Sequence, residues 1–417
     1  MKNFNPVRGC SEFMPKEATF REQVKQLILK SYQANGYNLI DTPILENLEF
    51  LNSSEGGDNL RMMFKTVKRG DKLNLSNPNL TEADITEEGL RYDLTVPLAR
   101  FYANNKDKLP LPFKAIQIGN SFRAERPQKG RFRQFIQCDI DVFGDPTINA
   151  ELELLLTSLE TYSSLGFKNL TLKINHREIL NAIVLASGFK AEDIATVCIS
   201  LDKLDKITKE DMARELEEKG FAHANINKLI KILTDVENKG VESVKKYTQN
   251  TQPVDDILFL INNLNKLTNG AFNIVFDVTI VRGQGYYTGT IYEMFTEGFS
   301  HAIGGGGRYD KMVGKLTGQN VPAVGFGLGF EPVVMLLQGL DVIKPQKQNL
   351  ALIYDADDSV EDMFKAKQML KQNYNVSLYL RQKNIKNFYD KITSVATLTT
   401  SVKDCLLGKE IKVLNKQ

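Results

Sequence analysis

The residues best suited to chemistry lie in one stretch, residues 122–144, with the sequence FRAERPQKGRFRQFIQCDIDVFG. An arginine such as Arg123 can grip a phosphate through two parallel hydrogen bonds and can neutralise charge that develops during phosphoryl or nucleotidyl transfer. The carboxylates of Asp139 and Asp141 suit a cationic amine. Four cationic residues lie between Arg123 and Asp139 in the sequence, and they suit a second polyanion such as a nucleic acid. Those cations are Arg126, Lys129, Arg131 and Arg133.

Alternation of apolar and polar residues predicts the elements that position this chemistry. Residues 116–125 and 135–142 both alternate with a period of two, which is typical of strands with one apolar and one polar face. Pro127 and Gly130 between the two runs indicate a turn. We therefore expect two antiparallel strands joined by a basic loop, although the alternation alone fits an exposed, salt-bridged hairpin equally well. The expected polar face carries Arg123, Glu125, Gln137, Asp139 and Asp141.

Bulk composition predicts an ordinary globular protein of two or three domains, because the chain has 417 residues, 42% of them hydrophobic and 25% charged. The net charge of +2 means that any nucleic-acid contact must rest on local basic patches. Four cysteines and three histidines show no disulfide or metal-ligand spacing, so we expect reduced thiols and no metal site in the protein. Without a long apolar run or an apolar signal segment, we expect a cytoplasmic protein that does not contact the membrane.

The string ERPQKGRFRQF, followed by Gln137, Cys138, Asp139 and Asp141, resembles the second signature of class II aminoacyl-tRNA synthetases, and most closely that of the histidyl-tRNA synthetase family. The resemblance implies an α+β fold, in which helices flank the antiparallel sheet of class II synthetases. It also implies a helical insertion and a short C-terminal α/β domain that resembles anticodon-binding domains. The expected boundaries are 1–176 and 268–343 for the catalytic core, 177–267 for the insertion and 349–417 for the C-terminal domain.

Further strings extend the resemblance, in order, over nearly the whole chain. GYNLIDTPILE resembles the first class II signature, in which the proline matching Pro43 lies at a dimer interface; a plain edge-strand proline is the alternative. LRYDLTVPLARF places Asp93 and Thr95 two residues apart, so they share a face of an extended chain. By resemblance they hold the amino group of the substrate, and helix capping is their alternative role.

Two glycine-rich strings resemble the histidine-specific signatures of the family. VRGQGYYTGTIYE contains Arg282 and two tyrosines, whose flat apolar rings with polar tips suit an imidazole. AIGGGGRYDKMVG contains Tyr309 after a run of glycines, which permit close approach of a ligand to the backbone. A glycine-rich turn packed with core tyrosines is the alternative for the first string, and a phosphate-binding loop for the second.

The resemblance implies a histidine–tRNA ligase activity, in which L-histidine reacts with ATP to give histidyl-adenylate and the histidyl group then passes to tRNA(His). ATP is a substrate in this scheme, Mg²⁺ bridges its phosphates, and the protein is a homodimer. The implied catalytic residues are Arg123 and Arg282, and Glu125 joins them in binding ATP. The implied histidine-binding residues are Asp93, Thr95, Gln137, Asp141, Tyr286, Tyr287 and Tyr309. The implied tRNA-binding residues are Arg126, Gln128, Lys129 and Arg131.

Two positions depart from the family pattern. Gly285 stands where the commoner string has aspartate, and Pro332 stands where the third class II signature has an arginine that meets the γ-phosphate of ATP. Pro332 favours a catalytically weakened paralogue, such as a regulatory subunit of ATP phosphoribosyltransferase, or a tRNA-binding scaffold with a decayed site. The complete Arg282 string and the residues beyond Asn349 favour the ligase.

Overall fold

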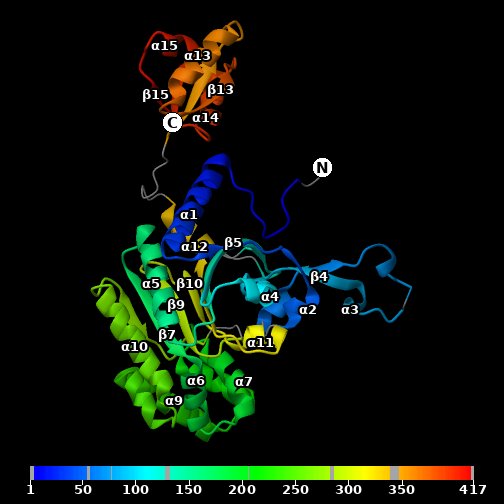
Figure 1. Cartoon of the computed structure of the whole chain (residues 1–417), viewed down its shortest axis with the longest axis vertical. Helices are drawn as coiled ribbons and strands as arrows, with labels where there is room; N and C mark the ends of the chain where they lie inside the picture. Colours follow the sequence, from blue (N-terminus) through cyan, green and yellow to red (C-terminus); the bar gives the residue numbers. More distant parts are fainter. Residues whose placement is uncertain are drawn as a thin grey trace. The chain divides into compact units, whose positions relative to one another are not determined.

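A computed structural model describes residues 4–53, 57–76, 78–126, 132–204, 206–281, 286–338 and 347–414 (Figure 1). The chain forms two compact units. Residues up to 11 and residues 27–338 make the larger unit, and residues 12–26 with those from 339 onward make the smaller one. The finer boundaries expected at 176–177 and 267–268 stay predictions.

An eight-stranded sheet forms the centre of the larger unit, in the order β1-β5-β6-β11-β10-β9-β7-β8. Strand β1 is parallel to β5 and β7 is parallel to β8, whereas the other neighbouring strands are antiparallel. The sheet is therefore mainly antiparallel, as expected, and the two parallel pairs were not predicted. Its strands are β1 (Asn38–Leu39), β5 (Phe113–Phe122), β6 (Gln134–Phe143), β7 (Leu170–His176), β8 (Asn273–Phe276), β9 (Thr290–Thr296), β10 (Gly304–Arg308) and β11 (Ala323–Gly329).

The predicted antiparallel hairpin is confirmed as β5 and β6, in a register that pairs Ile118 with Cys138. The alternative of an exposed polar face is wrong, because Asp139 and Asp141 are only 5% and 3% exposed. One detail of the prediction is also wrong, since β5 ends at Phe122 and the following residues, including Arg123 and Glu125, lie outside the strand. The backbone N–H of Arg123 still donates to the carbonyl of Arg133, so the segments that follow β5 and precede β6 continue side by side.

Helix α1 ends before Gly36, whose φ of +81° allows the chain to leave the helix. A second, three-stranded sheet has the order β2-β4-β3, and the sequence prediction missed its central strand. These elements are α1 (Pro15–Ala34), β2 (Leu45–Asn47), α2 (Leu48–Ser53), η1 (Gly57–Met62), β3 (Lys65–Val67), η2 (Gly70–Lys72), α3 (Glu82–Ile85), β4 (Thr86–Leu90), α4 (Thr95–Asn105), η3 (Lys106–Lys108) and α5 (Asn149–Ser164).

A group of helices separates β7 from β8 in the sequence, as predicted, and lies beside β7 in Figure 1. Gly188, Gly220 and Gly240 all have positive φ and lie between helices. After Leu201 the chain leaves α7 through turns. The group comprises α6 (Arg177–Ala186), η4 (Ala191–Asp193), α7 (Ile194–Leu201), α8 (Lys209–Glu218), α9 (His223–Lys239), η5 (Val241–Lys246) and α10 (Gln252–Leu267). The larger unit closes with α11 (Lys311–Thr317) and α12 (Phe330–Leu337).

The smaller unit contains the predicted β-α-β arrangement in a four-stranded sheet of order β13-β12-β14-β15. Alternation along the central strand β12 explains its two apolar faces: Leu350 and Leu352 pack with one cluster, and Ala351 and Ile353 with another. Helices supply the rest of each cluster. The elements are β12 (Asn349–Tyr354), α13 (Val360–Lys371), β13 (Asn375–Leu380), α14 (Ile385–Ile392), β14 (Leu398–Ser401), α15 (Val402–Leu406) and β15 (Lys412–Val413).

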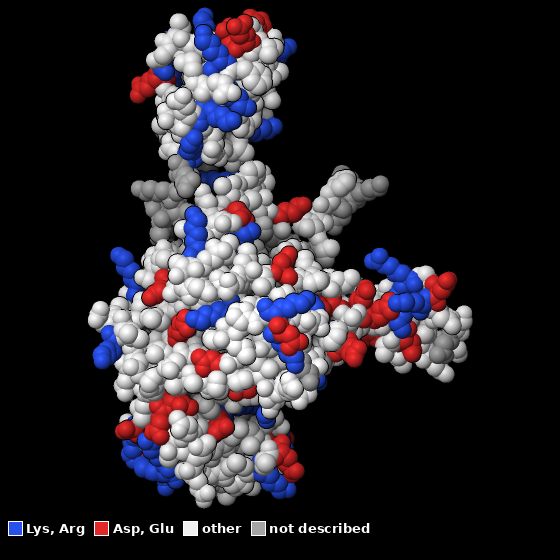
Figure 2. Space-filling model, in the orientation of Figure 1, with Lys and Arg blue, Asp and Glu red and all other residues white. Residues whose placement is uncertain are grey.

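The surface carries charges of both signs. On the face drawn in Figure 2, lysine and arginine side chains lie among aspartate and glutamate side chains. This mixture matches the small net charge of +2. Among the helices of the described residues, none combines the length and the apolar character needed to span a membrane.

Candidate functional site

Three buried carboxylates define the candidate site. Asp139 and Asp141 lie on β6, and Asp93 lies two residues before α4; their exposed fractions are 5%, 3% and 1%. One oxygen of each has no hydrogen-bond partner in the structure, namely Oδ2 of Asp93, Oδ1 of Asp139 and Oδ2 of Asp141. Buried polar atoms are nearly always hydrogen-bonded in folded proteins, so a cluster of unpaired acceptors indicates a place for a donor from outside the chain.

Burial makes these carboxylates hard to ionise. It raises the pKa of Asp93 to about 6 and that of Asp141 to about 7, and it raises the pKa of Asp139 well above its ordinary range. Mutual repulsion adds to the effect, since Asp141 and Asp93 both raise the pKa of Asp139. The Arg123 guanidinium acts in the opposite direction on Asp93 and Asp139. A bound cation would relieve the repulsion, and the cluster therefore favours a cationic ligand.

Asp93 makes the helix-capping contact, which is one of the two roles that the sequence left open. Its Oδ1 accepts a 3.1 Å hydrogen bond from the backbone N–H of Val96 in the first turn of α4, which is a capping contact. Its Oδ2 is one of the unpaired acceptors. Thr95, the first residue of α4, is half-buried. Gln137 lies on the same face of β6, where its amide donates to Asp139 Oδ2 at 3.3 Å and its Oε1 is unpaired.

The three predicted tyrosines gather beside the carboxylates. The Tyr309 hydroxyl donates a 2.5 Å hydrogen bond to Asp141 Oδ1. The ring of Tyr286 meets that of Tyr309 edge-on, with centroids 6.0 Å apart, and its centroid is 4.8 Å from that of Tyr287. All three side chains are at most 9% exposed. They form an aromatic wall with polar tips, as the sequence predicted.

Glycines on β11 make room for the carboxylates. The sheet register pairs Gly325 with Asp141 and Gly327 with Asp139. A Cβ atom on Gly325 would come within 1.9 Å of Asp141 Oδ1, and one on Gly327 within 2.9 Å of Asp139 Oδ1. Any larger residue at 325 would therefore push Asp141 out of position. The glycines of β11 thus leave space for the two carboxylates.

Arg123 interacts electrostatically with two of the buried carboxylates, Asp93 and Asp139. Its Nε donates to the carbonyl of Tyr92 at 3.0 Å, and its guanidinium carbon lies 5.0 Å from the centroid of the Phe135 ring. It is half-buried, as is Glu125. The second predicted catalytic arginine, Arg282, and the departure at Gly285 lie outside the described residues.

Of the predicted tRNA-binding residues, Arg126 is described and exposed, whereas Gln128, Lys129 and Arg131 lie outside the described residues.

The position of the third class II signature lies at the start of α12. Glu331 is buried and its Oε1 accepts a 3.2 Å hydrogen bond from the backbone N–H of Ile136. Pro332 is the third residue of α12 and supplies no charge.

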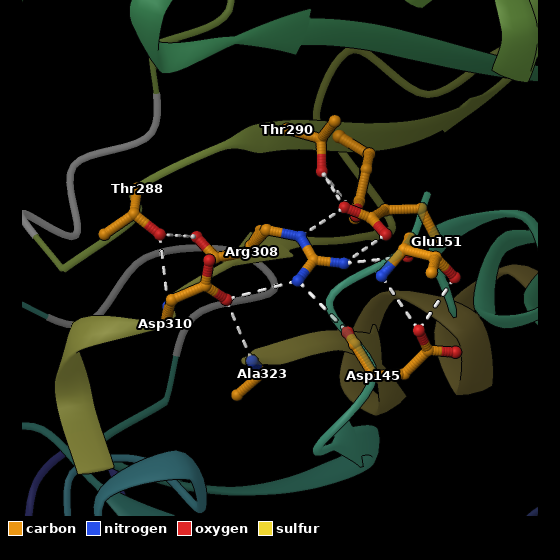
Figure 3. A network of polar contacts seen from close by, with 9 residues as sticks. Asp145, Glu151, Thr288, Thr290, Arg308, Asp310 and Ala323 are labelled. Carbon is orange, nitrogen blue, oxygen red and sulfur yellow. Dashed lines mark hydrogen bonds and ion pairs between the residues drawn. The ribbon is translucent and has the colours of Figure 1, made fainter. Parts of the chain in front are cut away.

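Two features of the site were given no histidine-binding role from the sequence. Alternation placed Asp139 on the polar face of β6 with Gln137 and Asp141, but the family resemblance assigned it no contact with histidine. The second feature is the network of polar contacts around Arg308 and Glu151 drawn in Figure 3. These residues are 157 positions apart, and no local pattern links them.

Comparison with known proteins agrees with this geometry. The model of the histidyl-tRNA synthetase family matches residues 9–333. A histidine–tRNA ligase of Leifsonia xyli subsp. xyli is 38% identical over 401 residues, which cover 93% of this chain and 92% of that protein. The family match spans all of the site residues described above.

Solved structures share the fold. A histidyl-tRNA synthetase from Nostoc sp. PCC 7120 has a TM-score of 0.74 at 22% identity and covers 99% of this chain and 97% of its own. A protein from Bacillus halodurans C, described as an ATP phosphoribosyltransferase regulatory subunit/histidyl-tRNA synthetase, has a TM-score of 0.75 at 17% identity, with coverages of 95% and 97%. At these identities the likeness shows the fold alone. The family match and the extensive identity to a ligase show that the chain belongs to the histidyl-tRNA synthetase family.

Proposed function

We propose that the protein is a histidine–tRNA ligase, which activates L-histidine with ATP and transfers the histidyl group to tRNA(His). The observation that carries the proposal is the cluster of buried carboxylates with unpaired oxygens beside Tyr286 and Tyr309. Histidine offers an ammonium group and an imidazole, so it can donate hydrogen bonds to several acceptors at once. Membership of the family and the names of its relatives agree with this substrate.

In the proposed complex, the ammonium group of histidine meets Asp93, Thr95, Gln137 and Asp141, and the tyrosines enclose the imidazole. Asp139 adds to the negative field that receives the ammonium. Because the free carboxylates repel each other, ammonium binding stabilises their ionised forms. Binding and ionisation are therefore coupled.

In the activation step, a carboxylate oxygen of histidine attacks the α-phosphorus of ATP, the bond to the β-phosphate oxygen breaks, and pyrophosphate leaves. No strong base is required, since the carboxylate is ionised at neutral pH. We propose that Arg123 and Arg282 stabilise negative charge at the α-phosphate, and that Glu125 meets the adenine amino group. Together these three residues form the proposed ATP site.

Mg²⁺ fits this scheme as a partner of ATP. Within the described part of the chain, no group of three or more His, Cys, Asp or Glu residues is arranged to hold a metal ion. Mg²⁺ is commonly bound through substrate phosphates with few protein ligands. We propose that it arrives with ATP and neutralises phosphate charge.

In the transfer step, a terminal ribose hydroxyl of tRNA attacks the carbonyl of histidyl-adenylate, loses its proton, and AMP leaves. We propose that Arg126, Gln128, Lys129 and Arg131 contact the acceptor end of tRNA(His), and that the C-terminal α/β unit contacts the anticodon. Cationic side chains such as those of Arg126, Lys129 and Arg131 suit a phosphate backbone. We also propose a cytoplasmic location, where translation uses the product.

Histidine-dependent exchange of labelled pyrophosphate into ATP tests the proposal. The ligase should show exchange that requires histidine, and then charging of tRNA(His). The alternative is a paralogue that regulates ATP phosphoribosyltransferase, which Pro332 favours. Well-folded protein that binds histidine without catalysing exchange would favour the regulator and reject the ligase.

A further inference from the structure

A buried ion pair is formed by Arg308, the residue that precedes Tyr309, and Glu151. Nε and Nη2 of Arg308 donate to Oε1 and Oε2 of Glu151 at 2.6 and 2.5 Å. The two side chains are 11% and 1% exposed. Figure 3 shows the guanidinium of Arg308 facing the carboxylate of Glu151, with Asp310 on its other side. The pair joins β10 to α5, and neither side chain has been given a role in the proposed reaction.

Further contacts fix the guanidinium. It donates to the carbonyl oxygens of Asp145 at 3.3 Å and Thr147 at 3.2 Å, and to Oδ1 of Asp310 at 3.2 Å. Thr290 adds a 3.1 Å hydrogen bond to Glu151 Oε1. Burial opposes the charge of Arg308, but its bonds to Glu151 prevail and raise its pKa. Arg308 is therefore a fixed cation with its donors directed at the surrounding acceptors.

The residues after Arg308 connect this ion pair to Asp141. The backbone N–H of Tyr309 donates to the carbonyl of Ala323 at 2.7 Å, and Oδ1 of Asp310 accepts from the N–H of Ala323 at 2.9 Å. Between these two anchors, the Tyr309 side chain reaches Asp141. Thr288, which follows Tyr287, donates its N–H to the carbonyl of Arg308 at 2.7 Å.

We propose that Arg308 and Glu151 are positioning residues for histidine, which hold Tyr309 in the orientation that donates to Asp141. Three consecutive residues each bind a different element: Arg308 binds α5, Tyr309 binds β6 and Asp310 binds β11. A shift of Arg308 therefore moves the backbone that carries Tyr309. This inference rests on the proposed function, because it assigns the effect to histidine as substrate.

The primary test is Arg308→Lys, which keeps the charge but cannot bridge both carboxylate oxygens and both carbonyls. We expect the KM for histidine in pyrophosphate exchange to rise roughly tenfold, the effect of one lost hydrogen bond. The KM for ATP should change less than about twofold, since the ATP residues lie elsewhere. Glu151→Gln, which preserves shape, should act in the same direction and replaces the first variant if that variant does not fold.

Glu46→Gln is the matched control. Glu46 forms an equally close two-bond pair with Arg100, both bonds being 2.7 Å, and the side chains are 5% and 19% exposed. This variant should lose stability without a selective change in the KM for histidine. A similar rise in that KM for Glu46→Gln, or equal changes for histidine and ATP in Arg308→Lys, would mean that the Arg308 pair acts only on general stability.

A double-mutant cycle with Tyr309→Phe tests the path of the effect. If Arg308 acts through the Tyr309 hydroxyl, Arg308→Lys should change the KM for histidine less than about twofold once that hydroxyl is removed. If the two substitutions instead raise the KM for histidine by factors that multiply in the double variant, Arg308 does not act through the Tyr309 hydroxyl. If the unmodified protein shows no histidine-dependent exchange, the proposed function fails. Calorimetric titration of histidine into the same variants then tests the positioning role separately.

Discussion

Tyr309 donates to one oxygen of Asp141, whereas the other oxygen of that carboxylate has no partner within the structure. The two residues are 168 positions apart and meet because β10 and β6 both flank β11. The hydrogen bond orients the carboxylate and leaves Oδ2 as an acceptor. One oxygen of Asp141 is thus hydrogen-bonded within the protein, and the other is available to a ligand.

Asp141→Asn should stabilise the histidine-free protein at pH 8 while it abolishes measurable histidine binding. The folded protein raises the pKa of Asp141 from its ordinary 3.8 to about 7, so it binds more protons than the unfolded chain between these values. The resulting stability is complete below pH 3.8 and is lost as the pH rises through 7. Asparagine still accepts from Tyr309 and does not ionise.

Urea unfolding at pH 8 and pH 4 checks this prediction. We expect the variant to gain up to roughly 4 kcal/mol at pH 8, the upper bound set by about 1.4 kcal/mol per pKa unit between 3.8 and about 7, and close to nothing at pH 4. Calorimetry with histidine provides the binding measurement. A variant less stable than the parent at pH 8 would show that the ionised carboxylate is better compensated than its burial indicates.

Gly325→Ala should raise the KM for histidine far more than Gly327→Ala does. The added methyl group at 325 would overlap Asp141 Oδ1 at 1.9 Å, whereas the one at 327 would lie 2.9 Å from Asp139 Oδ1. We expect losses of roughly a hundredfold and tenfold in kcat/KM for histidine, or about 2.7 and 1.4 kcal/mol. Kinetics measured on protein shown to be folded by circular dichroism checks the order, and the reverse order contradicts the assignment of Asp141 as the closer ligand.

Arg123→Gln should lower the kcat of pyrophosphate exchange roughly a hundredfold or more, because a donor that faces developing charge contributes a few kcal/mol. The KM for histidine should rise less, since Arg123 acts on Asp93 and Asp139 only through its charge. Arg214→Gln, an exposed change in α8, serves as the control. Unchanged kcat in the Arg123 variant would remove Arg123 from the catalytic residues.

Pro332→Arg should lower the KM for ATP several-fold, by supplying a cation where the family pattern has one. Position 332 lies in the first turn of α12, where an N–H makes no hydrogen bond within the helix, so the helix requires neither proline nor its absence there. Pro332→Ala removes the proline without adding a charge, so it separates the two effects, and it should leave the KM for ATP nearly unchanged. Equal effects of arginine and alanine would indicate a backbone effect instead.

Ile44→Asp should convert the proposed homodimer to monomers. Leu39, Ile44 and Leu45 flank Pro43 and are 51%, 41% and 40% exposed, and β1 is an edge strand of the main sheet. Such apolar exposure at a sheet edge favours an interface between two copies. Analytical ultracentrifugation measures the outcome. Leu75→Asp, a change at an apolar residue that is 66% exposed, is the control that should leave the assembly intact.

Much of this fold could be predicted, because alternation and amphipathic spacing are local properties. The β5–β6 hairpin, the helices between β7 and β8 and the C-terminal β-α-β arrangement all follow from such patterns. Alternation assigned Gln137, Asp139 and Asp141 to one face, but it does not say which face is buried. Burial of that face depends on partners far away in the sequence, among them Tyr309 and Asp93.

The predictions that failed depended on interactions between distant segments. The strand at Thr86–Leu90 is rich in glutamate and was missed, since its pairing with β2 and β3 outweighs its weak strand propensity. The glycine run at 304–307 forms β10, where close packing against β11 leaves no space for a Cβ at Gly306. Local composition contains neither piece of information.

The placement of the helical group between β7 and β8 has a consequence for biosynthesis. During translation, Asp93 and Asp141 leave the ribosome before the helices at 177–267, and Tyr286, Tyr309 and Gly325 leave it afterwards. Chain termination or arrest within the helical group would produce the carboxylates without their hydrogen-bond donor or their glycine wall. A nascent chain can therefore acquire affinity for histidine only after β10 and β11 have joined the sheet.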